Sequence, residues 1–433
     1  RGAFWQWLSQ RRREAMKALP PTSEPSHFMI CPDCDLAVEV EELHEGELAR
    51  CPRCGAVLMK IVHHPYLVPV LNAAAALVLM IAAELLPFMT VSAAGTNITM
   101  QLHDVATALF TSDYRYLGYV IYSVMQLIPA FMLLFTILIF AQLRLGIAGA
   151  RTYVILRAFS ILKEWSMVEV FLVAVLVSLV KVLSLADVKL GMGFFAFILY
   201  VIFYIRTVSS VDERWIWDRV TRIRKRVSAL AAGGGHTGLE LRLSSCPVCG
   251  EILPSGVRRC PRCGSKVIFA GDAGISSCVA FLIAACIMYV HANVMPIMVT
   301  ETMGSLYYST VMDGIIFMWT SGSYPVAAVI FIASVFVPVF KIAVLTWLCI
   351  SVRKLNFLKK PSHRKRIRLY RVTEFIGRWS MVDVFVVAFM AAYFQMGTMF
   401  SIFPGVASMS FCAVVILTML AANSFDPRLI WNV

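Results

Sequence analysis

The sequence has little charge for its length. Asp, Glu, Lys and Arg make up only 15% of its 433 residues, whereas hydrophobic residues make up 59% and the mean hydropathy is +0.75. Soluble domains are typically about 45–50% apolar, so this composition excludes an ordinary soluble protein. It indicates a polytopic membrane protein.

Two common signatures of hydrolytic enzymes are missing. The sequence has no G-x-x-x-x-G-K-[ST] phosphate-binding loop and no H-E-x-x-H zinc-protease motif. The first absence excludes ATP hydrolysis by a P-loop, and the second excludes the metalloproteases that use that motif. We therefore predict that the protein is not an enzyme.

Acidic residues are scarce relative to basic ones. There are 26 Asp and Glu against 39 Lys and Arg, for a formal net charge of +13. Such an excess can indicate nucleic-acid binding, but here the basic residues lie in short segments beside apolar runs, where the positive-inside rule places them. We interpret the charge as membrane topology and predict no nucleic-acid partner.

The distribution of Lys and Arg orients the chain. The segment 353–378 carries ten of them and the segment 206–242 carries eight, whereas 89–116, 186–189, 300–323 and 400–404 together carry two. The basic segments are therefore predicted to be cytoplasmic, together with both termini and the cysteine-rich segments.

The cysteines do not follow a disulfide pattern. Eight of the 12 form four C-x-x-C pairs, two before each apolar half: Cys31, Cys34, Cys51 and Cys54, then Cys246, Cys249, Cys260 and Cys263. Paired knuckles of this kind form four-thiolate structural zinc sites, so two zinc ions are predicted. A redox-active dithiol is the alternative, although it would need no second pair. The second site has a shorter spacing between its pairs.

The chain is an internal duplication. Trp165-Ser166-Met167-Val168-Glu169-Val170-Phe171 recurs as Trp379-Ser380-Met381-Val382-Asp383-Val384-Phe385, and prolines 87 and 129 recur 209 residues later. On one helix, the Trp and the carboxylate four residues later would share a face. The predicted fold is an all-α polytopic membrane protein with two tandem homologous four-helix transmembrane modules, each preceded by a small cytoplasmic zinc ribbon.

Six segments follow from these patterns. They are a basic N-terminal arm (1–27), zinc ribbon 1 (28–62), transmembrane module 1 (63–218), a linker (219–242), zinc ribbon 2 (243–270) and transmembrane module 2 (271–433). The spans of module 1 are expected at about 66–88, 117–143, 165–185 and 190–210. The spans of module 2 are expected at about 275–299, 324–350, 379–399 and 402–422.

Polar groups inside the spans are the candidate functional residues, because charge within a bilayer is costly. Lys341 lies about nine residues, or roughly 13 Å of helix, from the nearest span end, and Lys181 lies late in the third span. Ser334 and Ser178 precede these lysines on the same helical stripes. Thr418 is a further lining candidate, with a bond to its own backbone as the alternative.

Alternatives accompany the charged candidates. Lys181 could be a terminal lysine that reaches the headgroups. Glu169 and Asp383 could form structural ion pairs with Lys163 or Arg378 at the cytoplasmic interface. That position favours a role in helix entry for the two carboxylates, and the functional hypothesis rests more strongly on the lysines.

Several motifs together resemble one family. They are the C-P-x-C knuckles, A-N-V-M-P-I-M at 292–298, S-Y-P-V-A-A-V-I-F-I-A-S at 323–334, G-R-W-S-M-V-D-V-F at 377–385 and D-P-R-L at 426–429. From about residue 28 to residue 433 the chain resembles the paraquat-inducible protein A family, which includes the lipophilic envelope-spanning tunnel protein A branch.

The resemblance implies a multi-pass protein of the bacterial inner membrane. It further implies a partner of the mammalian-cell-entry (MCE) type, a hexameric periplasmic tunnel, and transport of phospholipid between the two membranes. A small-molecule or proton-coupled transporter, with Glu169 and Asp383 titrating, is the rival hypothesis. A zinc-stabilised scaffold that only anchors the tunnel is a third.

Overall fold

The computed structural model describes most of the chain beyond the N-terminal arm. The described residues are 27–40, 43–93, 96–110, 115–183, 187–220, 236–254, 256–267, 272–302, 304–322, 324–352, 362–393 and 400–431. They form two compact units, one from the described residues of 27–75, 130–165 and 203–267 and the other from those of 76–129, 166–202 and 272–431. The units group residues by contact and not by sequence repeat, so the domain limits given above stay predictions.

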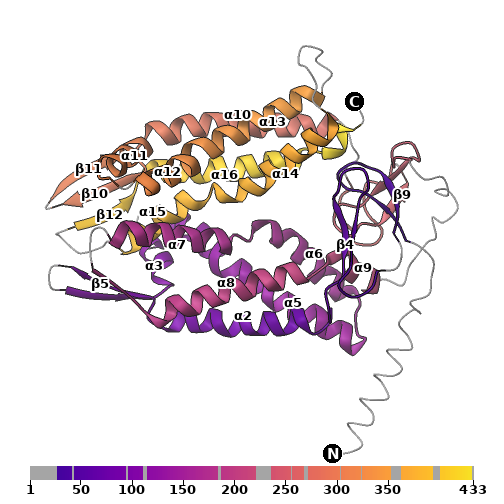
Figure 1. Ribbon diagram of the computed structural model, residues 1–433, viewed down its shortest axis with the longest axis horizontal. Helices are drawn as coiled ribbons and strands as arrows, with labels where there is room; N and C mark the ends of the chain where they lie inside the picture. Colours follow the sequence, from indigo (N-terminus) through magenta and orange to yellow (C-terminus); the bar gives the residue numbers. More distant parts are fainter. Residues whose placement is uncertain are drawn as a thin grey trace, which may run out of the picture. The chain divides into compact units, whose positions relative to one another are not determined.

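Long apolar helices dominate the structure (Figure 1). Within the described ranges, six helices are long and apolar enough to cross a membrane. They are α2 (Val68–Leu85), the helix Gly118–Leu145, α8 (Met192–Ser210), Gly274–Val294 within α10 (Asp272–Val294), the helix Ala327–Val352 and α16 (Val406–Ser424). With the two cysteine clusters, these helices confirm the predicted fold class of a multi-pass membrane protein with tandem modules.

The repeated Trp-Ser-Met signature breaks a helix in each half. Trp165 ends α6 (Ala150–Trp165) and α7 begins at Val168, while Trp379 ends α14 (His363–Trp379) and α15 begins at Val382. The prediction that Trp and carboxylate share one helix face is therefore wrong. Glu169 instead lies in the first turn of α7 (Val168–Leu183), where the partial positive charge of the helix N-terminus stabilises a carboxylate. The described part of α15 ends at Tyr393.

Each half also contains one π-helical turn at the same position in the repeat. Ser123–Leu127 joins α4 (Arg115–Tyr122) to α5 (Ile128–Leu145), and Ile332–Phe336 joins α12 (Tyr324–Phe331) to α13 (Val337–Val352). A proline two residues later, Pro129 or Pro338, explains both turns. Proline has no amide hydrogen and its ring clashes with the carbonyl four residues earlier, so the backbone widens there.

A three-stranded antiparallel sheet, which the sequence analysis did not predict, lies in each half, in or beside the segments with few Lys and Arg. The first has the order β6-β5-β7 (Thr96–Met100, Met89–Ala93 and Asp187–Leu190). The second has the order β11-β10-β12 (Ser305–Ser309, Met298–Thr302 and Phe400–Pro404). In the second, Met298 pairs with both Ser309 and Pro404, and Figure 1 shows these strands beside one end of α10 and α16. The shared strand order supports the duplication.

A glycine follows the third strand of each sheet for a steric reason. A Cβ on Gly191 would lie 2.0 Å from the Pro87 carbonyl oxygen, and one on Gly405 would lie 2.2 Å from the Pro296 carbonyl oxygen. The Gly405 amide donates to the Ile297 carbonyl at 2.8 Å. Only glycine permits so close an approach between the two backbones.

The remaining elements are short. Strands β1 (His27–Ile30), β2 (Ala37–Val40), β3 (Leu48–Arg50) and β4 (Val57–Lys60) lie in the first cysteine-rich segment, and β8 (Leu243–Ser245) and β9 (Ile252–Pro254) lie in the second. Four further helices are α3 (Asp104–Phe110), α9 (Glu213–Val220), α11 (Val311–Thr320) and the 3-10 helix Pro427–Ile430.

Small side chains allow close packing of the spans in the second unit. Helices α10 and α16 pack along each other, and Ala285, Ala292 and Ala421 are fully buried. Lipid is as apolar as these side chains, so close van der Waals contact between small residues is what favours helix association in a membrane. A larger apolar cluster at the other end of α10 includes Cys278, Leu345 and Phe425.

Candidate functional site

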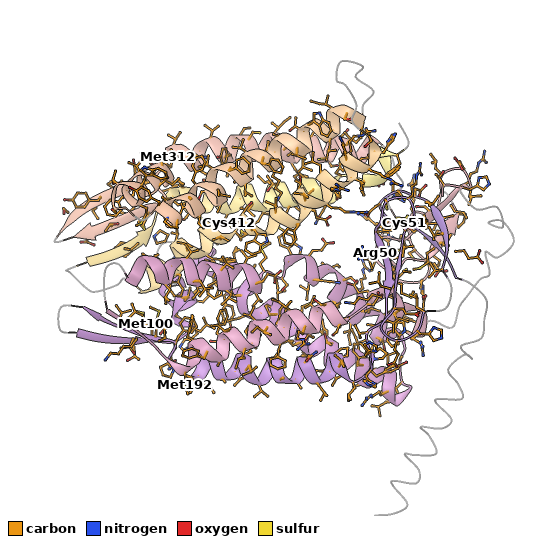
Figure 2. All side chains as sticks on the ribbon, viewed as in Figure 1. Arg50, Cys51, Met100, Met192, Met312 and Cys412 are labelled. Carbon is orange, nitrogen blue, oxygen red and sulfur yellow. The ribbon has the colours of Figure 1, made fainter. Side chains whose placement is uncertain are left out.

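Four thiols converge in each cysteine-rich segment. Their sulfur atoms all lie within 4.8 Å of one another in each cluster, and no other described residues form such a group. In the first, Sγ of Cys31 lies 3.5 Å from Sγ of Cys54, and Cys51, labelled in Figure 2, lies 3.5 Å from Cys34. Cys246–Cys263 and Cys249–Cys260 have the same separation in the second.

The local backbone explains how each knuckle closes. The residue after the second cysteine of every pair has a positive φ: 59° at Asp35, 72° at Gly55, and 70° at both Gly250 and Gly264. In each case its amide donates to the carbonyl of the first cysteine, as for Gly55 and Cys51 at 2.8 Å. Glycine adopts this conformation without strain, which is why it follows three of the four pairs.

The chemistry of the donors fits a metal ion. Seven of the eight cysteines are buried, and thiolates at this spacing match the tetrahedral shell of a soft or borderline metal. A hydrogen bond from Cys34 lowers the pKa of the Cys31 thiol to about 5, so one ligand of the first cluster ionises readily. Both clusters could hold metal ions, as predicted.

Helix α9 and the residue before it, Asp212, contact the first cluster's segment through polar groups. The Lys60 amide donates to Oδ2 of Asp212 at 2.7 Å, and Nη1 of Arg214 donates to the Leu58 carbonyl at 2.7 Å. Burial raises the pKa of the Asp212 carboxyl, although hydrogen bonds from Trp215 and Lys60 oppose the shift. The repeat of this motif behaves differently, because Asp426 and Arg428 pair with each other at 2.8 Å.

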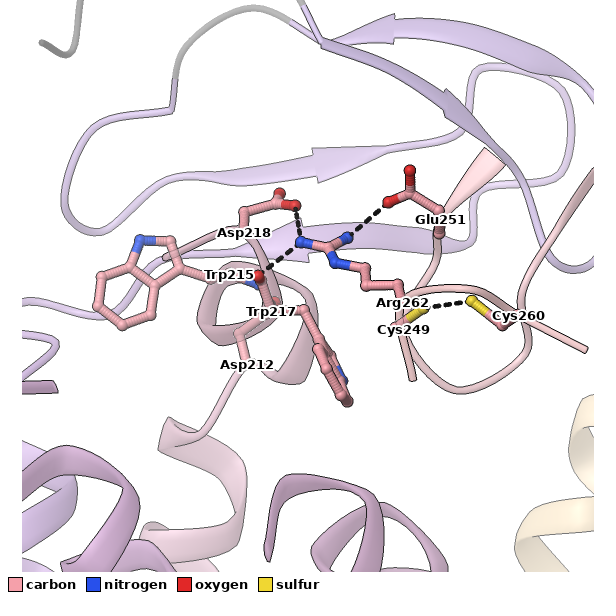
Figure 3. Close-up of polar contacts among 8 residues, drawn as sticks. All are labelled: Asp212, Trp215, Trp217, Asp218, Cys249, Glu251, Cys260 and Arg262. Atoms are coloured by element: carbon pink, nitrogen blue, oxygen red, sulfur yellow. Dashed lines mark hydrogen bonds and ion pairs between the residues drawn. The ribbon is translucent and has the colours of Figure 1, made fainter. Parts of the chain in front are cut away.

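Arg262 attaches the second cluster's segment to the same helix. It lies between Cys260 and Cys263, and its guanidinium donates to Oε2 of Glu251 at 2.9 Å and to the Trp217 carbonyl at 2.5 Å. Figure 3 shows the guanidinium between Glu251 and Asp218, whose carboxylate lies 3.3 Å away. Burial raises the pKa of Glu251, and the charge of Arg262 opposes that shift. Sequence reasoning missed this residue because its partners lie far away in the chain.

Replacing Arg262 with alanine is expected to loosen the second cluster. The change leaves the Trp217 carbonyl and Glu251 without the guanidinium, which lowers the stability of the closed second cluster by about 2 kcal/mol. If the whole loss appears in the opening rate, the cluster opens roughly 30-fold faster. Metal release to a chromophoric chelator measures the effect. Arg259→Ala is the matched control, because Arg259 is exposed. Equal release rates for the two variants would contradict the assignment.

Lys341 is buried, whereas Glu169, the other charged path residue with a described side chain, is only partly buried. The side chain of Lys341 is 1% exposed, and its Nζ has no hydrogen-bond partner among the residues that the structure describes. It lies in α13, 14 residues from one end and 11 from the other of the helix Ala327–Val352. A Cβ on Gly377 would lie 2.7 Å from this Nζ. The glycine in α14 thus makes room for the amine.

Of the other predicted path residues, some have side chains that the structure describes and two do not. Ser334, Ser178 and Thr418 are buried, and their hydroxyls donate to the carbonyls of Ile330, Ala174 and Val415 at 2.7, 2.8 and 3.0 Å. For Thr418 this backbone bond is the alternative raised above. Lys181 lies in α7 and Asp383 in α15, but their side chains lie outside the described part of the structure.

Lys163, the expected ion-pair partner of Glu169, forms an ion pair with Glu213. Nζ of Lys163 lies 3.0 Å from Oε1 of Glu213 in α9, and Ser160 also donates to that carboxylate. Glu169 itself is partly buried.

Two further residues were missed. They are Gly377, which lies against Lys341, and Ser380, whose hydroxyl is buried and has no hydrogen-bond partner among the described residues. Comparing the halves would have given one signal: Lys163 matches Gly377, and Met132 matches Lys341. Each half thus carries a lysine at a position where the other half has none, in α6 and in α13.

A second polar group, in the first half, was also not predicted as a site. Gln126 of the π-helical turn donates to the Glu84 carboxylate, and Nδ1 of His103 lies 3.9 Å from the same group. His103 also lies 3.5 Å from Asp104. Glu84 therefore has neighbours within the protein and need not reach the headgroups. The matching residues of the second half are Asn293, Val335 and Met312, so the group belongs to one half only.

Comparisons with known proteins agree with this architecture. The family model described as paraquat-inducible protein A matches residues 69–221 and 275–433. The chain is 37% identical over 404 residues to "Intermembrane transport protein PqiA" of Escherichia coli (strain K12), covering 93% of this chain and 95% of the relative. It is 28% identical over 421 residues to "Probable intermembrane transport protein" of Haemophilus influenzae, covering 95% and 97%.

A third relative represents another branch. The chain is 26% identical over 426 residues to "Lipophilic envelope-spanning tunnel protein A" of Escherichia coli (strain K12), covering 98% of this chain and 96% of the relative. No solved structure matches. The family model covers most of the chain outside the cysteine clusters, and the relatives align over nearly all of it. The protein is therefore a member of the paraquat-inducible protein A family.

Proposed function

We propose that the protein is an inner-membrane component of an intermembrane lipid transport system. It passes phospholipid to or from a periplasmic tunnel partner of the MCE type. The names of the relatives, an intermembrane transport protein and a lipophilic envelope-spanning tunnel protein, support transport between membranes. They are names of transport proteins, which fits a protein without catalytic activity.

The observation that carries the lipid assignment is the buried amine of Lys341. A charged amine within a bilayer is costly and needs an anionic or hydrogen-bonding partner. No described residue supplies that partner. The phosphodiester of a phospholipid supplies two unesterified acceptor oxygens that share one negative charge, and the acyl chains of the lipid match the apolar surroundings. Ser380 adds a buried hydroxyl three residues after Gly377.

The remaining path residues belong to the same proposal. Lys181, Ser178, Ser334 and Thr418 line the route of the lipid. Glu169 and Asp383 fix the entry of the third and seventh spans at the cytoplasmic interface. Both termini and both cysteine clusters are cytoplasmic, because the basic segments are predicted there. The ion in each cluster is zinc, since four thiolates with no open position form a structural zinc site.

Native mass spectrometry of the purified full chain tests the lipid assignment. The wild-type protein is expected to retain a phospholipid, and Lys341→Ala is expected to reduce the retained fraction at least tenfold, which corresponds to losing about 1.4 kcal/mol of a charge-assisted contact. Lys189→Ala is the matched control, because Lys189 is exposed on β7. Equal retention in the two variants, or no lipid in the wild type, would contradict the proposal.

The group around Glu84 favours a second candidate, a proton-coupled transporter. A carboxylate at the end of a span beside a histidine can exchange protons with the adjacent aqueous phase. Uptake driven by a pH gradient in liposomes without any partner protein would support this candidate. Lipid transfer that needs the tunnel partner would support the first.

A further inference from the structure

The hairpin of β10 and β11 exposes large apolar side chains on both of its faces. Leu306, Tyr307 and Tyr308 are consecutive in β11 and are 53, 61 and 64% exposed. Neighbouring residues in a strand point to opposite faces, so both faces of this strand are exposed in the part of the chain that the structure describes. Water would be an unfavourable environment for such a surface.

Helix α11 continues this surface. Val311 and Ile315 of α11 pack into a small buried cluster with Ala407. On the other side Met312, marked in Figure 2, Ile316 and Trp319 are 43, 56 and 57% exposed. Their spacing of four and three residues places them on one stripe. Helix α11 has ten residues, too few for a span, yet it is apolar on both sides.

In the chain, the hairpin and α11 directly follow α10, a span with an exposed apolar stripe. Ile283, Ile287, Val290 and Val294 are exposed at helical spacing along α10, which is itself long and apolar enough to cross the membrane. The hairpin follows the end of this stripe directly, and the next span begins just after α11. We call Leu306, Tyr307, Tyr308, Met312, Ile316 and Trp319 the aromatic rim.

The charge of this region selects the kind of partner. From residue 267 to residue 340 the sequence has no Lys or Arg, and between 293 and 340 its only acidic residues are Glu301 and Asp313. Asp313 is engaged in a capping box with Thr310 at the start of α11. A surface without cations attracts no acidic polypeptide or nucleic acid. Its apolar side chains and its phenol and indole tips fit a lipid surface, because such groups prefer the membrane–water interface.

The position of β11 at the edge of its sheet indicates how deeply the hairpin lies in the membrane. Strand β11 is an edge of its sheet, so its outward amides and carbonyls pair with no other strand of this sheet. Hydrocarbon cannot hydrogen-bond these groups, whereas the hydrated headgroup layer can. We propose that the aromatic rim lies in the lipid headgroup layer at this end of the spans and contacts phospholipids directly. This goes beyond the proposed transport function and does not depend on it.

Photo-crosslinking from the full chain in liposomes of phosphatidylethanolamine and phosphatidylglycerol tests the inference. p-Benzoylphenylalanine replaces Tyr307 in one variant and Tyr308 in another. Both positions are exposed, so neither substitution removes a buried contact. Intact mass spectrometry is expected to show an added phospholipid at a yield at least tenfold above that from the same probe at Val57. Val57 is the control because it is 49% exposed and lies in a cysteine-cluster segment.

A probe at Ile287 gives the reference for the hydrocarbon core, since this residue is 65% exposed in α10. Adducts from Tyr307 and Tyr308 are expected near the glycerol end of the lipid, and those from Ile287 further along the acyl chain. Lipid yields at Tyr307 and Tyr308 no higher than at Val57 would overturn the inference. The same crosslinks in intact cells giving a polypeptide adduct in place of lipid would also overturn it, because a protein would then pair with the edge strand.

Discussion

Replacing Lys341 with leucine is expected to stabilise the protein and to abolish transport. The substitution removes a buried amine that has no hydrogen-bond partner among the described residues, and such a group costs about 1–3 kcal/mol. Transport of isotope-labelled phospholipid between the membranes of living cells is expected to fall at least tenfold. A gain in stability with a loss of function is the signature of a functional residue that strains the fold.

A substitution at Gly377 tests whether the effect of Lys341→Leu comes from the amine and from the space beside Gly377 that the amine occupies. Gly377→Ala places a Cβ 2.7 Å from Nζ and 3.1 Å from Cε of Lys341, so it should displace the lysine, destabilise the wild type by about 1–3 kcal/mol and reduce transport. In the Lys341→Leu background the nearest atoms are gone, and alanine within a helix should then stabilise by about 0.5–1 kcal/mol. Thermal unfolding of the four proteins measures this coupling.

The outcomes separate three roles for Lys341. Loss of transport in both single variants, with coupled stabilities, supports the lipid path. Transport that survives Lys341→Leu at normal expression would contradict it and would support a scaffold that anchors the tunnel. Additive stability changes would mean that Lys341 and Gly377 do not meet.

Removing the metal is expected to unfold both cysteine clusters. Structural zinc sites of this type contribute about 10–16 kcal/mol of binding at neutral pH, far more than the few strands around each cluster can supply. Asp212 should lose its contact with Lys60, and α9 its contact with Arg262, at the same time. Hydrogen–deuterium exchange after treatment with a strong chelator is expected to rise at least a hundredfold in residues 243–267 and in α9.

The spans provide the internal control. Exchange within α10 and α16 should stay unchanged, because these helices belong to the other compact unit. Cys249→Ser should reproduce the effect of the chelator in the second cluster, whereas Cys286→Ser should not, since Cys286 is an exposed residue of α10 and belongs to neither cluster. Protection of residues 243–267 that survives chelation would show that metal does not hold this segment.

The sequence was sufficient wherever the signal is local. A cysteine pair and the glycine after it form a knuckle within five residues, so the two clusters were predictable from spacing. Hydrophobic spans are likewise recognised from composition over about 20 residues, and six described helices have the required length and hydropathy. The repeats followed from residue identities alone.

The break at the signature was not predictable from these averages. A window of about 20 residues does not resolve the short gap between Trp165 and Val168. The small sheets were missed for a related reason. Strands of four or five residues are too short to stand out in such a window, and the third strand of each sheet, such as β12 beside β10, lies about a hundred residues from its partner.

The sequence by itself determined that this is a duplicated, multi-pass membrane protein with two four-cysteine clusters that could hold metal ions, because repeats, hydropathy and ligand spacing are properties of the chain. Only the tertiary structure decided which helix faces the amine of Lys341, which residues hold Arg262, and that Asp212 binds a neighbouring segment while Asp426 binds Arg428. These choices depend on contacts between residues distant in the chain. The space beside a glycine and a carbonyl that accepts a hydrogen bond cannot be recognised from the sequence. Each depends on a neighbour that only the folded backbone brings close.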